Sequence, residues 1–110
     1  MCGIVGVISN APVDRPLVER MRDQLSHRGP DHAGVWASRD SRVCLAHRRL
    51  AIVDLSPEGR QPMVSESGRF VIIFNGEVYN FASLRRDLEA AGHFVSSPTH
   101  CVSNGRDIDT

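Results

Sequence analysis

The chain begins with an apolar run, MCGIVGVIS, in which only glycines interrupt the apolar side chains before the final serine. Successive side chains of a strand point to opposite faces, so residues 2–9 have apolar side chains or none on both faces. We therefore expect a buried strand here. Because such a strand needs cover on both faces, the run favours a fold in which helices pack on sheets.

Three further segments are predicted to be strands. Residues 69–74 are almost all apolar, which predicts a second strand that is buried on both faces. Residues 34–38 and 43–54 have strand-like composition, although the second segment contains the charged sequence HRR. Prolines and a glycine within residues 57–62 predict a loop before the last strand.

The first helix is expected to begin at Pro16, because the missing N–H of proline costs nothing in a first helical turn. Gly29 is placed as its C-cap, and Pro30 prevents its continuation. One apolar stripe of this helix is formed by four residues: Leu17, Val18, Met21 and Leu25.

The second helix is predicted over residues 81–91, with Asn80 as its N-cap and Gly92 after its end. Leu84 and Leu88 are expected to face inward. A length of 110 residues allows one domain. The order of strand, helix, three strands and helix indicates a mixed α/β or α+β domain.

Charge and composition exclude several function classes. Thirteen basic and thirteen acidic side chains give a formal net charge of zero, and no basic cluster suggests binding to nucleic acid or to a membrane surface. The longest apolar run, residues 71–74, is too short to span a bilayer. A neutral surface is compatible with a small zwitterionic substrate or a protein partner.

The three cysteines, Cys2, Cys44 and Cys101, form neither a disulfide framework nor a C-x-x-C pair for metal or redox chemistry. The N-terminus lacks the positively charged region of a signal peptide. We therefore expect the reducing cytoplasm, where a free thiol persists.

Cys2 has two interpretations. It is a small apolar residue at the start of a buried strand, since free cysteine is often buried. Alternatively, loss of Met1 leaves a thiol and a free α-amine on one residue, which supplies a nucleophile and its base together. An α-amine with a pKa of about 7.7–8.0 is partly neutral near pH 7 and can accept the thiol proton. Gly3, which has no Cβ, would let a substrate approach the backbone closely.

The sequence HRGPD, residues 27–31, also has two interpretations. His27 and Arg28 near a helix C-terminus complement the helix dipole, and Gly-Pro-Asp is typical of turns. The same loop could instead support a nearby reactive group.

Two arginines, Arg48 and Arg49, interrupt the apolar pattern of residues 43–54. An arginine on an inner sheet edge is costly unless it meets a carboxylate, which it binds in a two-point geometry. The alternative is a surface arginine whose stem lies along the sheet.

Asn75 and Gly76 follow the most apolar predicted strand. Asn-Gly between apolar runs is the strongest short signal of a β-hairpin with a type I′ turn. Alternatively, the Asn side-chain amide and the next backbone N–H form a donor pair for an oxyanion. Together, a nucleophile with its own base, an arginine and an oxyanion hole would suit acyl transfer from a small amide that bears a carboxylate.

Five motifs, MCGIVGV, HRGPD, HRRLAIVDL, GRQPM and FNGEVYNF, occur in the order and spacing of class II glutamine amidotransferase domains. The chain most resembles the domains that begin glutamine-hydrolysing asparagine synthetases. The resemblance implies that Cys2, after loss of Met1, attacks the side-chain amide of glutamine and releases ammonia. Asn75 and Gly76 would form the oxyanion hole, and Arg28 would support the nucleophile.

The resemblance also implies the substrate contacts. Arg49 would bind the α-carboxylate of glutamine, and Glu77 would help to orient its amino end. The segment that contains Leu50, Ile52 and Val53 would lie along the substrate backbone.

The implied fold is α+β, the four-layer αββα sandwich of N-terminal-nucleophile hydrolases, incomplete in this chain. Residues 1–95 would form the N-terminal part of the amidotransferase domain. Residues 96–110 depart from the family pattern, which continues with Asp-Thr-Glu-Val, and we expect a truncated product with an off-pattern tail. An inactive fragment or a non-catalytic binding module is the alternative function, and a redox-responsive thiol protein is a third.

No cofactor or metal is expected in this chain. The resemblance implies ATP and magnesium for a synthetase domain that would use the ammonia to convert aspartate to asparagine. Glutamine is the expected small-molecule substrate. A synthetase domain or subunit is the expected protein partner, and a homodimer is a candidate assembly.

Overall fold

The computed structural model describes residues 2–51 and 59–93, and its elements are strands and helices of a mixed α+β fold. In chain order they are β1 (Gly3–Ile8), α1 (Arg15–Asp23), β2 (His32–Ala37), β3 (Val43–Arg49), β4 (Met63–Val64), β5 (Val71–Ile72) and α2 (Phe81–Ala90). Strands β1, β3 and β2 form an antiparallel sheet in that order, and β4 and β5 form a separate antiparallel pair. The antiparallel pairing places the fold in the α+β class rather than the α/β class.

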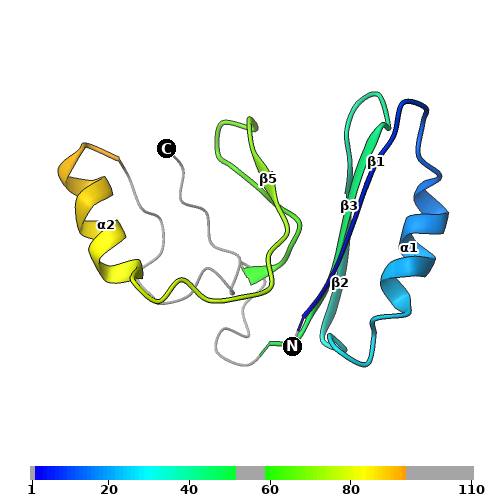
Figure 1. Ribbon diagram of the computed structural model, residues 1–110, viewed down its shortest axis with the longest axis horizontal. Coiled ribbons are helices and arrows are strands. Elements are labelled where there is room, and N and C mark those ends of the chain that lie inside the picture. The colour runs from blue at the N-terminus through cyan, green and yellow to red at the C-terminus, as the bar shows by residue number, and fades with distance from the viewer. Residues whose placement is uncertain (1, 52–58, 94–110) are drawn as a thin grey trace.

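Across the molecule, α1 lies on one side of the three-stranded sheet, the β4–β5 hairpin lies on the other side, and α2 is the outermost element beyond the hairpin (Figure 1). This order gives each strand of the larger sheet one face toward a helix. The opposite face is turned toward the smaller sheet.

The main core lies between α1 and the sheet. Val18 of α1 is buried against Cys44 and Ala46 of β3, which is the central strand. The strand register explains this packing, because Ala46 pairs with Val5 on one side and with Val35 on the other, so all three share a face. Burial of a side chain the size of Val18 contributes about 1.5–3 kcal/mol to stability.

Helix α1 is shorter than the sequence pattern predicts, because it ends at Asp23 and Gln24 is its C-cap. The prediction that Gly29 caps this helix is therefore wrong. The predicted apolar stripe is also only partly correct, since Leu17 and Met21 are 45% and 43% exposed. Of these helical residues, only Val18 is buried against the sheet, because one short helix contacts the sheet along a narrow strip.

The second face of the sheet is covered in part by the segment that precedes β4. A Cβ added to Gly34 of β2 would lie 2.0 Å from the carbonyl oxygen of Gln61, so only glycine allows this approach. The backbone N–H of Phe74 donates to Oε1 of Gln61 at 2.6 Å, which ties the chain after β5 to the same segment. The prediction that β1 is buried on both faces is wrong, because Ile4 and Ile8, on the face opposite Val5, are 47% and 82% exposed.

The β4–β5 hairpin corrects two predictions. The sequence analysis missed β4, and the hairpin turn lies between Ser65 and Phe70, where Gly68 has a φ of 74°. Strand β5 covers only two residues, and Ile72 is 41% exposed. The prediction of a strand over residues 69–74 that is buried on both faces is therefore wrong. The tight turn at Gly68 needs a glycine, because a positive φ is strained for other residues.

Helix α2 confirms the predicted second helix within one residue. Asn80 precedes it but makes no side-chain cap hydrogen bond, while Gly92 has a φ of 89° and the N–H of His93 donates to the Leu88 carbonyl, which is a Schellman ending. Leu84 is exposed rather than inward-facing, because no other described element packs closely on α2.

Strand β3 is confirmed from Val43 to Arg49, and its predicted continuation to residue 54 falls mostly outside the described residues. The predicted tail at residues 96–110 also lies outside them. Within the described part of the chain, neither helix has the length and apolar character needed to cross a membrane.

Candidate active site

Cys2 lies immediately before β1, buried against the end of β3. The backbone N–H of Leu50 donates to its Sγ at 3.3 Å, and the Leu50 carbonyl oxygen lies 3.9 Å from the same sulfur. The register produces this contact, because Gly3 pairs with Arg48 and the next residues outward in both strands are drawn together. The thiol therefore lies between the N–H and the carbonyl of Leu50, and the sulfur accepts a hydrogen bond from the N–H.

The backbone of Cys2 is held by Arg28. The Arg28 Nε–H donates to the Cys2 carbonyl oxygen at 3.3 Å. Arg28 lies beyond the end of α1, so the interpretation that it complements the dipole in the last helical turn is wrong. Gly3 allows a close approach, but to a side chain of the protein, since an added Cβ would lie 2.7 Å from Cβ of Leu25.

The loop of residues 27–31 is bound along the end of β3. A Cβ on Gly29 would lie 2.3 Å from the Arg48 carbonyl carbon, so the two backbones touch. The Asp31 N–H donates to the Arg49 carbonyl at 2.9 Å, and the Ala51 N–H donates to Oδ2 of Asp31 at 2.8 Å. The loop therefore fixes the end of β3 and the residues that follow it, among them Leu50, whose N–H contacts Cys2.

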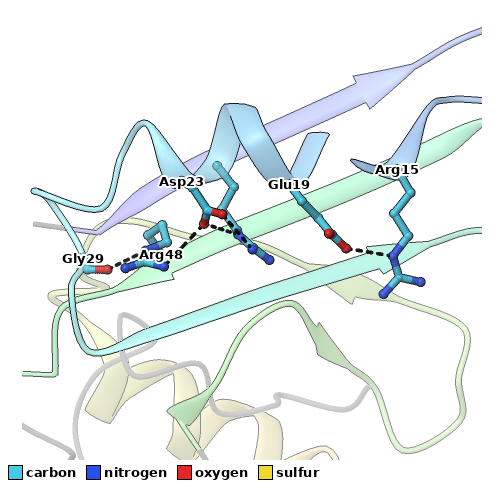
Figure 2. Close-up of polar contacts among 6 residues, drawn as sticks. Arg15, Glu19, Asp23, Gly29 and Arg48 are labelled. Atoms are coloured by element: carbon cyan, nitrogen blue, oxygen red, sulfur yellow. Dashed lines mark hydrogen bonds and ion pairs between the residues drawn. The ribbon is translucent and has the colours of Figure 1, made fainter. Parts of the chain in front are cut away.

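The two arginines of β3 point to opposite faces of the sheet and have different surroundings. On the α1 side, Arg48 donates from Nε to the Gly29 carbonyl at 2.8 Å and from Nη1 to Oδ1 of Asp23 at 3.4 Å (Figure 2). Hydrogen bonds from Arg22, with the charges of Arg22 and Arg48, lower the pKa of the Asp23 carboxyl. Arg48 thus joins the end of α1 to the loop of residues 27–31.

Arg49 is only 4% exposed and lies on the face of the sheet opposite α1. It lines a pocket of about 240 Å³ whose described lining residues are Asp31, His32, Arg49, Ala51 and Arg60. Burial, and then the charge of Arg60 followed by that of Arg49, lowers the pKa of His32. Near neutral pH the lining therefore contains two guanidinium groups, a neutral imidazole and one carboxylate, which suits an anionic group.

Asn75, Gly76 and Glu77 lie between β5 and α2, outside regular secondary structure. Gly76 is not among the glycines with a positive φ, so the type I′ hairpin interpretation is wrong. Within the described residues, the hydrogen bonds of Cys2 join it to Leu50 and Arg28 rather than to these three residues.

The structure thus brings two of the predicted site residues, Cys2 and Leu50, into contact, and it places the adjacent Arg49 in a pocket. Ile52 and Val53 lie outside the described residues. Within the described ranges, no three His, Cys, Asp or Glu side chains are grouped to hold a metal ion.

Sequence reasoning missed several polar groups at and beside the pocket, among them His32, His47, Arg60 and Gln61. Gln61 and His47 are fully enclosed, and burial lowers the pKa of His47 to about 4 although the Phe74 carbonyl opposes the shift. The available signal was the Arg-Gln-Pro sequence, residues 60–62, in which polar residues precede a proline in a segment that becomes buried.

Comparison with known proteins identifies the family. The model of the family described as "Glutamine amidotransferase domain" matches residues 1–102. The chain is 42% identical over 98 residues to asparagine synthetase [glutamine-hydrolyzing] 3 of Bacillus subtilis, an alignment that covers 84% of this chain and 16% of that protein. No solved structure matches the chain significantly.

Two other relatives are also matched over most of this chain but over less than a fifth of their own length. A probable asparagine synthetase [glutamine-hydrolyzing] of Dictyostelium discoideum is 38% identical over 105 residues, which are 92% of this chain and 18% of the relative. Amidase chry2 of Gibberella zeae is 38% identical over 109 residues, with 88% and 16% covered. The chain spans less than a fifth of the length of these relatives, and its match lies in the glutamine-hydrolysing portion of the synthetases. The chain belongs to the glutamine amidotransferase domain family.

Proposed function

We propose that this chain forms part of a glutaminase site that releases ammonia from glutamine, with Cys2 as the nucleophile. The observation that supports the proposal most directly is the position of Cys2. Its sulfur receives the Leu50 N–H at 3.3 Å, and the residue before Leu50 is the pocket arginine, Arg49. The Cys2 thiol therefore lies next to the residue that follows Arg49, the proposed carboxylate-binding residue.

The proposed chemistry begins with the α-amine of Cys2, which accepts the thiol proton after Met1 has been removed. The thiolate attacks the side-chain amide carbon of glutamine, and the carbonyl oxygen becomes an oxyanion that Asn75 and the Gly76 N–H stabilise. As the C–N bond breaks, the departing nitrogen of the substrate takes the proton from the α-ammonium group of Cys2. Ammonia is released, and a γ-glutamyl thioester remains on Cys2. Water hydrolyses the thioester to glutamate and restores the thiol.

The substrate would be oriented by charge. Arg49 would bind the α-carboxylate, because a buried guanidinium pairs with a carboxylate through two hydrogen bonds. Glu77 would orient the amino end, and Leu50, Ile52 and Val53 would lie along the substrate backbone. The four-layer αββα sandwich is the finer fold that we propose, supported by the order of layers in Figure 1.

We assign use of the ammonia to a synthetase domain or subunit that amidates aspartate to asparagine in the cytoplasm. ATP and magnesium would be bound by that domain or subunit. The names of the relatives from Bacillus subtilis and Dictyostelium discoideum support this assignment.

The proposed activity is tested by incubating the chain, extended by the rest of the amidotransferase domain, with L-glutamine and measuring ammonia and glutamate. We expect equal amounts of both products, none from Cys2→Ala, and unchanged amounts from the matched control Cys44→Ala. Intact mass should show that Met1 is absent, because the proposed base is the free amine of Cys2. Ammonia release that survives Cys2→Ala, or active protein that retains Met1, would contradict the mechanism.

A further inference from the structure

The described lining of the pocket that contains Arg49 has more positive than negative charge. Its described lining contains two guanidinium groups, Arg49 and Arg60, and one carboxylate, Asp31. Arg49 is buried and projects from a strand, whereas Arg60 is exposed and belongs to the segment that precedes β4. Two cations from separate parts of the chain therefore converge on one pocket.

The carboxylate of Asp31 is already engaged. Its Oδ2 accepts the N–H of Ala51 at 2.8 Å, which holds the loop of residues 27–31 against the end of β3. Arg60, in turn, makes no ion pair or side-chain hydrogen bond with any described residue. Its charge nevertheless reaches into the pocket, because it is the first of the charged groups that lower the pKa of His32.

This arrangement discriminates between the two ends of an amino acid. A carboxylate entering the pocket meets two guanidinium groups, and both can donate charge-assisted hydrogen bonds. An ammonium group entering the same pocket meets two like charges, and the only carboxylate in the described lining has one oxygen committed to the backbone.

We propose that Arg60 is a second carboxylate-binding residue of this pocket, and that the chain recognises primary amides that bear a carboxylate whether or not they have an α-amine. The inference rests on the proposed function for the choice of amide, and it extends that function by naming the substrate class. Arg49 supplies the buried, rigid contact, and Arg60 supplies an exposed contact that salt weakens.

The test measures the dissociation constants of three compounds by titration calorimetry. L-glutamine has both charged groups, 4-carbamoylbutanoate lacks the α-amine, and 4-aminobutanamide lacks the carboxylate. We expect 4-carbamoylbutanoate to bind within about tenfold of L-glutamine, and 4-aminobutanamide to bind at least about a hundredfold more weakly.

The variants are Arg60→Gln, Arg49→Gln and the control Arg39→Gln, which removes an exposed arginine from the β2–β3 turn. Arg60→Gln should weaken binding of both carboxylates about tenfold and leave 4-aminobutanamide unchanged, whereas Arg39→Gln should change nothing. The effect of Arg60→Gln should shrink at high salt more than that of Arg49→Gln, because exposed charges are screened more.

The outcomes separate this inference from the proposed function. If L-glutamine binds and Arg60→Gln behaves like Arg39→Gln, or if 4-carbamoylbutanoate fails to bind, the inference is wrong and the glutaminase proposal stands. If 4-carbamoylbutanoate binds through Arg60 while L-glutamine does not bind, the inference stands and the glutaminase proposal is wrong. If neither carboxylate binds, both are wrong.

Discussion

At the scale of single residues, Arg48 and Arg49 show how strand geometry gives two adjacent arginines different surroundings. They are adjacent in sequence, but successive side chains of a strand face opposite ways. Arg48 joins Asp23 and the Gly29 carbonyl on the α1 side, and Arg49 lines the pocket on the other side. The sequence showed two arginines in an apolar strand, and only the sheet shows that one of them is structural.

This difference predicts that two matched substitutions affect different properties, stability in one case and glutamine binding in the other. Arg48→Ala should lower the free energy of unfolding by about 1–3 kcal/mol, because it leaves the Gly29 carbonyl without its donor. Arg49→Ala should mainly weaken glutamine binding, by roughly 1.5–3 kcal/mol for a lost charge-assisted contact. Urea unfolding and calorimetric titration of both variants check this. Equal losses of affinity in the two variants would argue against the division of roles.

Gly29 gives a second prediction at this scale. Gly29→Ala should destabilise the chain by about 1–3 kcal/mol or more, because the new Cβ would lie 2.3 Å from the Arg48 carbonyl carbon and the loop would have to move. Gly6→Ala is the matched control, since its Cβ would meet nothing closer than 3.4 Å. Urea unfolding of both variants measures the difference, and equal stability would show that the loop does not press on β3.

At the scale of elements, local signals predicted the bounds of some helices and strands and missed those of others. The bounds of strand β1 and helix α2 agree with the sequence because apolar pattern and flanking residues indicated the same bounds, although β1 is buried on one face only. Helix α1 was predicted too long, because Gly29 was taken for a cap when its role is close contact with β3. A hairpin at Asn75-Gly76 was one of two interpretations, but the turn that forms lies at Gly68, beside a strand of two residues that gives almost no periodic signal.

The candidate site was predictable where it follows from motifs and register. The motif at the N-terminus identified Cys2, and pairing of β1 with β3 then places Leu50 against its sulfur. The pocket was not predictable in the same way. His32 and Arg60 join it through contacts between segments far apart in the chain, and neither residue has a local pattern that marks it.

At the scale of the whole molecule, the buried histidine between the two sheets makes stability depend on pH. Burial lowers the pKa of His47 from 6.5 to about 4, and burial also lowers the pKa of His32. Between pH 6.5 and about 4, His47 binds a proton in the unfolded chain but not in the folded chain. The free energy of unfolding should therefore fall as the pH is lowered from about 6.5 to about 4.

Urea unfolding across this pH range tests the expected slope. A single histidine contributes at most about 1.4 kcal/mol per pH unit. His47→Gln should reduce the slope, leaving the part contributed by His32, while the control His27→Gln at an exposed position should leave it unchanged. A slope that is identical in the native chain and in His47→Gln would contradict the burial of a neutral imidazole.

The central claim is that Cys2 is a nucleophile beside a glutamine pocket, and covalent labelling tests it most directly. The glutamine analogue 6-diazo-5-oxo-L-norleucine loses nitrogen when a thiolate attacks it, so peptide mass spectrometry locates the adduct. We predict one adduct, on Cys2, that L-glutamine suppresses. Cys44 should remain unlabelled, because it is buried and burial raises the pKa of its thiol. Labelling that is absent from Cys2, or that L-glutamine does not suppress, would contradict the account.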